Sequence, residues 1–188
     1  MGAQRTTTDR LLTIEEFEQL PEEDTARVEL VRGVLVREPR PAAMHGWVQV
    51  KLGSMLLNHV EQHGLGHVFS DIGVILSTEP ATVRGPDLAF VSIERLPSGP
   101  PERGFLAFAP DLCVEIVSPS NTSAEIHEKV LDYLEAAARL VWVVHPEART
   151  ITEYRSPTEI RILGVAEELE GGPVIPGFRA PVASVFAR

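Results

Sequence analysis

Two carboxylates stand in strongly apolar stretches of the sequence, where an unpaired charge is costly. Asp87 follows a proline and opens the run Asp87–Val91, whose other members are apolar. Glu115 lies within Leu112–Val117, and all the remaining residues of this run are apolar. An ionised carboxylate buried without a partner costs several kcal/mol or undergoes a large rise in pKa. A metal ion, a basic partner or a bound proton could stabilise such a group.

The two acids would repel each other on neighbouring strands unless a cation lies between them. Because carboxylate oxygens are preferred ligands of Mg²⁺, the pattern indicates a divalent metal site at Asp87 and Glu115. Lys129 is a candidate third member, since it lies at the border of the apolar stripe of an expected helix. A border lysine can reach along the core toward a strand end. There it could orient an attacking water molecule or help to deprotonate it.

Each of these residues also has a purely structural interpretation. Asp87 could be a turn residue at the start of a strand, and Lys129 could be a solvated helix residue. Glu115 could form a buried salt bridge instead of binding a metal. Its candidate partners are Lys129, Arg84 and Arg139. The combination of two acids and a nearby lysine is more specific than any one of them.

The periodicity of the chain predicts an α/β fold, with a central mixed sheet flanked by a few helices. Apolar-rich runs predict strands at about 27–30, 34–37, 66–70, 73–77, 86–91, 111–118, 140–144, 150–155 and 159–163. Helices are expected over 14–20, from Met44 to a C-terminal cap at Gly64, and after the capping box Thr122–Glu125. The tail after residue 163 is expected to be rich in loops.

Length and composition limit the class of protein. The 188 residues suit a single domain, 1–188, with residues 1–10 expected to be flexible. No apolar run approaches the ~20 residues that cross a bilayer, so no membrane partner is expected. The single cysteine, Cys113, fits the reducing cytoplasm. The net charge of −10 argues against an extended nucleic-acid surface, unless a local basic patch or bound metal ions offset it.

The candidate residues resemble the motif of the PD-(D/E)xK nuclease superfamily. In that motif a Pro-Asp strand is followed by an acid on the next strand and by a lysine two positions later. Pro86-Asp87 and Glu115 match it, whereas Val117 stands at the third position. In several branches the lysine has moved to the following helix, which is where this chain has Lys129.

Over roughly residues 12–186 the chain is similar to the Uma-type putative restriction endonuclease family, a bacterial branch once classed as a domain of unknown function. The matching stretches are Glu29–Leu35, His45, Pro86–Val91, Pro110–Ser120, Lys129 with Tyr133, Val141–Val144 and Pro176–Phe178. Two stretches depart from the family pattern. Ala137–Leu140 stands where Gly-Val is usual, and His145-Pro146 stands where Asp-Pro is usual. Both lie beyond the acidic cluster, so they affect turn geometry more than the chemistry.

The resemblance implies a restriction endonuclease-like core and a metal-dependent phosphodiesterase. By analogy, Asp87 and Glu115 would hold Mg²⁺ together with the backbone carbonyl of Ile116, and Mn²⁺ could substitute. The ion would polarise the phosphate and generate hydroxide near neutral pH. Lys129 would steady the nucleophile or the developing charge.

Two further residues come to the expected site through the resemblance alone. Glu29 would be a further metal ligand, or else a surface acid in a hairpin. His45 would touch the site or the substrate, or else cap the N-terminus of its helix.

The function expected from these residues is Mg²⁺-dependent cleavage of DNA, and a homodimer would let two sites address two strands. The alternative is a catalytically inactive descendant that keeps the fold as a binding or dimerisation module. The acidic net charge favours this alternative, and the missing strand lysine is compatible with it. A hydrolase of another phosphodiester is a third class.

Overall fold

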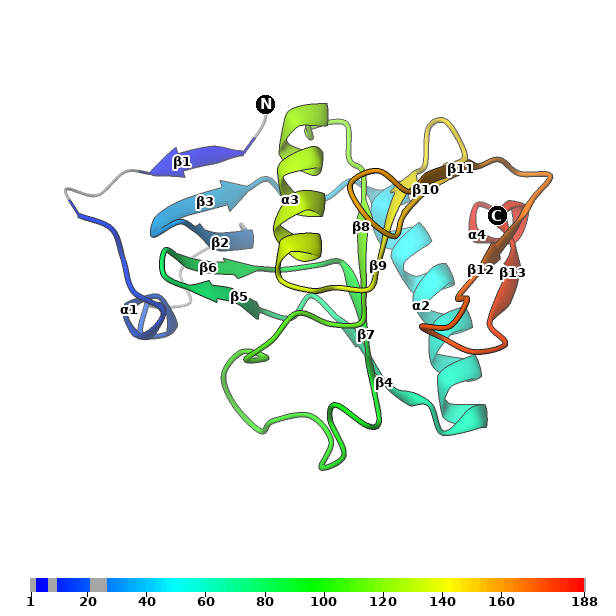
Figure 1. Cartoon of the computed structure of the whole chain (residues 1–188). Coiled ribbons are helices and arrows are strands. Elements are labelled where there is room, and N and C mark those ends of the chain that lie inside the picture. Colours follow the sequence, from blue (N-terminus) through cyan, green and yellow to red (C-terminus); the bar gives the residue numbers. More distant parts are fainter. Residues whose placement is uncertain (1–2, 7–9, 21–26, 188) are drawn as a thin grey trace.

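The structure, a computed structural model, describes residues 3–6, 10–20 and 27–187. A six-stranded sheet forms its centre (Figure 1). In spatial order its strands are β11 (Ile160–Leu163), β10 (Thr150–Tyr154), β9 (Leu140–His145), β8 (Leu112–Ile116), β7 (Leu88–Ser92) and β4 (Gly66–Ser70). Strand β8 is antiparallel to β7 and parallel to β9. The sheet is therefore mixed, and β8 is one of its inner strands.

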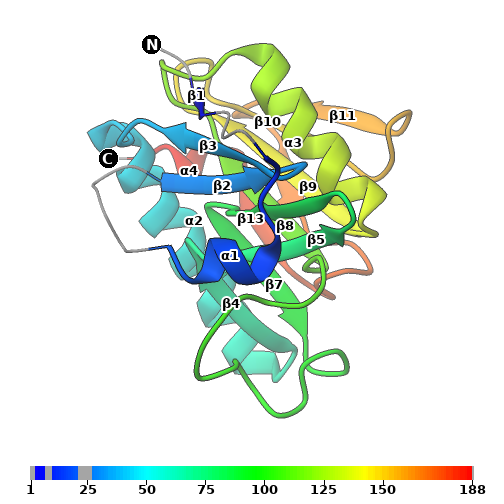
Figure 2. The same cartoon turned by 90° about the vertical axis from the view of Figure 1, so that its left-hand side faces the viewer.

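A second, five-stranded sheet lies to one side of the first. In spatial order its strands are β1 (Gln4–Thr6), β3 (Val34–Glu38), β2 (Arg27–Val31), β6 (Ala81–Arg84) and β5 (Val74–Thr78). The β2–β3 hairpin turns through Arg32 and Gly33, which have φ of 51° and 79°. Positive φ at both central residues matches the twist of the flanking strands. Figure 2 looks onto this sheet, with the short helix α1 (Ile14–Glu18) in front.

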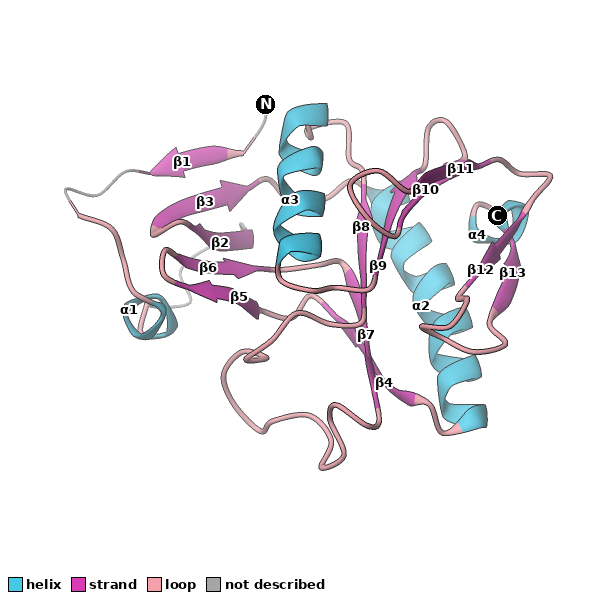
Figure 3. Cartoon of the chain, in the orientation of Figure 1, coloured by secondary structure: helices cyan, strands magenta, loops and turns pink. Residues whose placement is uncertain are grey.

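Two long helices cover opposite faces of the six-stranded sheet (Figures 1 and 3). Helix α2 (Ala43–His63) ends at Gly64, whose φ of 61° is the left-handed conformation expected of a C-terminal cap. Its buried apolar side chains recur every fourth residue, at Val48, Leu52, Leu56 and Val60. They pack against the side chains that β7 and β8 direct to this face: Leu88, Phe90, Leu112, Val114 and Ile116.

Helix α3 (Ser123–Glu135) covers the other face. Thr122 and Glu125 form the predicted capping box at its start. Its buried residues pack with Cys113, Val141 and Val143. Because side chains alternate along a strand, Glu115 lies on the same face of β8 as Cys113 and points toward α3. Strand β8 is buried on both faces, as the run of apolar residues predicts.

The C-terminal part is more regular than the expected loops. Strands β12 (Glu168–Glu170) and β13 (Arg179–Pro181) pair, and helix α4 (Val182–Val185) follows. Figure 1 shows them beside α2, where their apolar side chains complete the core around that helix. Among the residues described, every helix is too short or too polar to span a bilayer.

The structure confirms the α/β class and the mixed sheet flanked by helices. It adds β6, which the sequence analysis leaves out, and shortens the first helix from 14–20 to Ile14–Glu18. Within residues 1–10, expected to be flexible, Gln4–Thr6 form β1 because their backbone pairs with the distant strand β3. Residues 1–2 and 7–9, which belong to the same prediction, lie outside the described residues.

Candidate metal and catalytic site

Asp87 is fixed between two strands and a helix. It follows Pro86, immediately precedes β7, and is 1% exposed. Its Oδ2 accepts a hydrogen bond from the backbone N–H of Ile116 at 2.6 Å. The same oxygen lies 3.0 Å from Nε2 of His45, in the first turn of α2. The carboxylate is therefore oriented by β8 and α2, which is more than a turn residue at a strand start requires.

Glu115 lies 3% exposed on the α3 face of β8. Lys129 Nζ is 3.2 Å from its Oε2, and the Tyr133 hydroxyl donates to its Oε1 at 2.6 Å. Burial raises the pKa of Glu115 to about 8, and the charges of Asp87 and Glu29 add to the rise, although Lys129 opposes it. At neutral pH this carboxyl thus favours its protonated form, and a cation at the site would favour ionisation instead.

Lys129 is buried in the same cluster rather than solvated. Its Nζ lies 2.9 Å from Oε1 of Glu38 and 3.1 Å from Oε1 of Glu29, in addition to its contact with Glu115. Burial alone would lower the pKa of Lys129, but these carboxylates raise it well above its ordinary value. Lys129 is therefore a charged ammonium, suited to stabilise negative charge and unsuited to take a proton from water.

Glu29 is buried, so its interpretation as a surface acid of the hairpin is wrong. Its Oε1 accepts from Lys129 Nζ and, at 2.9 Å, from the backbone N–H of Gly85. Its Oε2 accepts from Nη1 of Arg84 at 2.8 Å. Although burial opposes the effect, Lys129 and Arg84 hold the pKa of Glu29 below its usual value. Glu29 is also absent from the lining of the pocket that Asp87 and Glu115 share, which fits support of Lys129 better than metal ligation.

The alternative partners proposed for Glu115 have other contacts. Arg84 binds Glu29 and, through Nε at 2.9 Å, Oδ2 of Asp132 on α3. Arg139 is exposed and lies 3.6 Å from Oδ1 of Asp111. Lys129 is therefore the partner of Glu115, so the salt-bridge interpretation and the metal-site interpretation share the same residues.

Glu38 was not anticipated as part of this cluster, although its position carries a signal. Glu29 pairs with Val36 in the hairpin register, so the two side chains share one face. Glu38, two residues beyond Val36, lies on that face as well because side chains alternate. An acid at that position adds a third carboxylate around Lys129.

A small pocket joins the candidate residues. Asp87, Glu115, Ile116, His45 and Glu38 line it, together with the loop that follows β8. It offers about 10 Å³ to the centre of a water-sized sphere, which is enough for roughly one water molecule or ion. Buried His45 adds a polar atom, Nδ1, that has no hydrogen-bond partner among the residues described.

The donors at this pocket fit Mg²⁺ better than metals that need several protein ligands. Within the described residues no group of three or more His, Cys, Asp or Glu side chains is arranged to hold a metal by itself. Mg²⁺ commonly takes one or two carboxylates and completes its shell with water and substrate phosphate oxygens. Asp87 and Glu115 supply two carboxyl groups that line the same pocket.

Comparisons with known proteins concern nearly the whole chain. The model of the Uma2 family, described as "Putative restriction endonuclease", matches residues 14–183. Among solved structures, the chain resembles a putative nuclease belonging to DUF820 from Anabaena variabilis ATCC 29413. The TM-score is 0.80 and the identity 21%, over 93% of this chain and 97% of the other, so this likeness shows a shared nuclease-like fold. No curated protein matches.

Proposed function

The chain belongs to the Uma2 family, whose model covers residues 14–183, and from this premise we propose that it is a metal-dependent DNA endonuclease of the PD-(D/E)xK type. One observation carries the proposal. Two buried carboxylates on neighbouring strands, Asp87 and Glu115, line one ion-sized pocket with a charged lysine bonded to one of them. This is the donor set that metal-assisted phosphodiester hydrolysis needs.

Asp87 and Glu115 would hold Mg²⁺ or Mn²⁺, with the carbonyl of Ile116 as a further oxygen donor. When bound, the ion supplies a Lewis acid for the phosphate and lowers the pKa of a coordinated water molecule.

The remaining groups orient these ligands and complement the charge. Tyr133 and Lys129 each hold one oxygen of Glu115, and the Ile116 amide and His45 hold Oδ2 of Asp87. Ligands fixed in this way bind without further ordering of their side chains. Lys129 provides a positive charge that favours the extra negative charge of the phosphoryl transition state.

The proposal includes a cytoplasmic location and a homodimer whose two sites address the two strands of DNA. The single cysteine is buried in the core, which is consistent with a reducing compartment.

Cleavage assays with purified protein test the proposed function. Supercoiled plasmid, single strands and branched DNA would be incubated with Mg²⁺, Mn²⁺ or EDTA. We expect metal-dependent cleavage by the wild-type chain and by Glu61→Gln, an isosteric change at an exposed acid of α2, and none by Asp87→Asn. Equal cleavage by Asp87→Asn, or no cleavage of any substrate, would contradict the proposal and favour the non-catalytic module.

A further inference from the structure

A pocket of about 600 Å³ lies next to the acidic site and has no part in the hydrolysis proposed above. The loop after β8 separates the two pockets, and Asn121 lines both. The volume is within the range of about 300 to 1,000 Å³ that is usual for small-molecule sites. The pocket could therefore hold a group that is attached to the substrate of the neighbouring site.

Part of its lining is apolar and aromatic. Val143 of β9 and Ile126 of α3, both buried, line the pocket together with half-buried Tyr154 at the end of β10. The hydroxyl of Tyr154 has no hydrogen bond within the part of the chain that the structure describes. An aromatic ring beside an apolar surface is the arrangement on which nucleobases stack without sequence preference.

The polar part of the lining offers donors. Oδ1 of Asn121 accepts from the backbone N–H of Ser118 at 2.8 Å, and no described residue accepts from its amide NH₂. Burial lowers the pKa of His145, and its Nε2 lies 3.3 Å from Oγ1 of Thr152, so Nδ1 is the ring nitrogen that remains for a ligand. His127 lines the pocket from the exposed side of α3. Such groups bind phosphate oxygens and the edges of bases.

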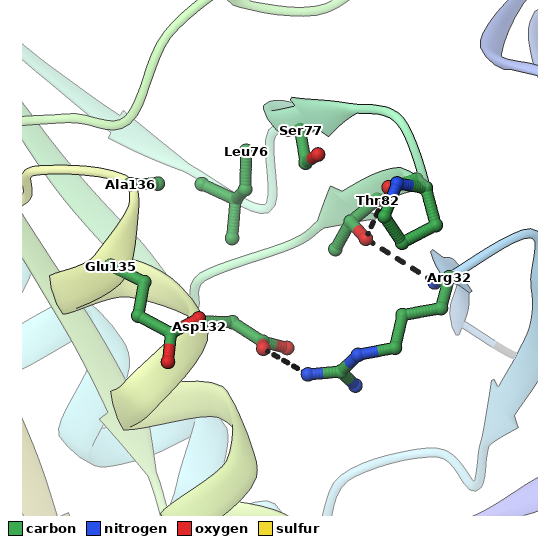
Figure 4. A pocket seen from close by; sticks show the side chains of 8 residues that line it. Arg32, Leu76, Ser77, Thr82, Asp132, Glu135 and Ala136 are labelled. Atoms are coloured by element: carbon green, nitrogen blue, oxygen red, sulfur yellow. Dashed lines mark hydrogen bonds and ion pairs between the residues drawn. The ribbon is translucent and has the colours of Figure 1, made fainter.

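The lining also differs in charge from the acidic pocket and from two further pockets. No carboxylate is among its described lining residues, whereas the net charge of the chain is −10. Asp132 and Glu135 line another pocket, of about 280 Å³, and there Asp132 pairs with Arg32 at 3.0 Å (Figure 4). A pocket of about 250 Å³ near α1 contains Glu29 and Asp71. An anionic strand would meet less repulsion at the acid-free pocket than at these two.

We propose that this pocket binds one nucleotide of the substrate strand, next to the phosphate that occupies the acidic site. The base lies against the ring of Tyr154 and the apolar lining beside it, and the nucleotide's own phosphate binds near Asn121 and the histidines. The inference rests on the proposed function for the identity of the strand. It adds that the protein binds an unstacked base, so single-stranded or distorted DNA is the preferred substrate class.

Binding of deoxynucleoside 5′-monophosphates to the full chain, in EDTA, tests this without catalysis. Titrations followed by ¹H–¹⁵N spectra should show millimolar or tighter binding, with shifts at Asn121, His145 and Tyr154. Tyr154→Ala should weaken the affinity about tenfold, in line with the measured effect of base stacking. Tyr154→Phe, which keeps the ring, should bind nearly as well as the wild type. Ile93→Ala, at an exposed apolar position just after β7 and outside the pocket lining, is the control and should leave affinity unchanged.

Titrations with inorganic phosphate and with the free deoxynucleosides separate the contribution of the phosphate group to binding from that of the nucleoside. Each should bind more weakly than the nucleotide. Equal binding of phosphate and nucleotide, shifts confined to other surfaces, or no effect of Tyr154→Ala would overturn the inference. Nucleotide binding that depends on Tyr154 in a protein that cuts no DNA would sustain the pocket and refute only the proposed function.

Discussion

Replacing Glu115 by glutamine tests whether the buried carboxyl carries a proton in the metal-free protein. Burial raises its pKa from 4.5 to about 8. Between these two values the folded chain holds a proton that the unfolded chain has lost, so the free energy of unfolding falls as pH rises. Glutamine has nearly the shape of the neutral carboxyl and cannot ionise. The stability of Glu115→Gln should therefore lack the decrease with rising pH that Glu115 causes in the wild type.

The size of the effect follows from the pKa shift. Each pH unit between about 4.5 and 8 is worth about 1.4 kcal/mol for one proton. The free energy of unfolding of the variant, relative to that of the wild type, should therefore be about 4 kcal/mol higher at pH 8 than at pH 5. The contributions of Glu29 and Lys129, whose charges are present in both proteins, cancel in the comparison to first order.

Urea unfolding in EDTA at pH 5, 6.5 and 8 measures this difference, with Glu61→Gln as the control. Saturating Mg²⁺ at pH 8 should then stabilise the wild type more than the variant, because only the wild type keeps both carboxylate ligands. A ligand at one hundred times its Kd adds about 2.7 kcal/mol. A stability difference that is the same at all three pH values would refute the raised pKa of Glu115, and equal stabilisation of both proteins by Mg²⁺ would refute its role as a ligand.

The remaining predictions concern the surroundings of the site. Lys129→Met removes the cation that contacts Glu29, Glu38 and Glu115, so it should destabilise the fold by about 3–5 kcal/mol at pH 7 and by less at pH 5, as measured by urea unfolding. Tyr133→Phe removes the hydrogen bond to Glu115 and should cost about 1–3 kcal/mol in stability, with weaker Mg²⁺ binding by calorimetry; unchanged stability and affinity would count against that contact. Leu56→Ala opens a cavity on the opposite face of the sheet and should cost about 2–5 kcal/mol while leaving the Mg²⁺ affinity of the folded protein unchanged.

The apolar context of the two acids made most of the site predictable. The runs around Asp87 and Glu115 predict buried strands, and in the structure the pairing of β7 with β8 brings the two acids close together. Lys129 could be predicted as a candidate because helical periodicity places it beside the apolar stripe of its helix. These inferences depend on local patterns, which a single sequence contains.

The contacts that support Asp87, Glu115 and Lys129 were harder to predict from the sequence, because they depend on how the two sheets pack together. Glu29 belongs to a hairpin whose exposure cannot be read from the hairpin itself, and only its contacts with Lys129 and Arg84 show that it is buried. Glu38 reaches the same lysine from the adjacent strand. Strand β6, which carries Arg84, was missed because it is only four residues long and lies between prolines. Strand β1 exists through pairing with a strand about thirty residues away.

Anomalous diffraction from crystals soaked in Mn²⁺ tests the central claim most directly. If Asp87 and Glu115 share a divalent ion, a peak should appear between their carboxylates, about 2.0–2.2 Å from an oxygen of each. The peak should be lost in crystals of Asp87→Asn and kept in Glu61→Gln. Strong density elsewhere, such as at His59 and His63 on α2, with none between the two acids, would contradict the account.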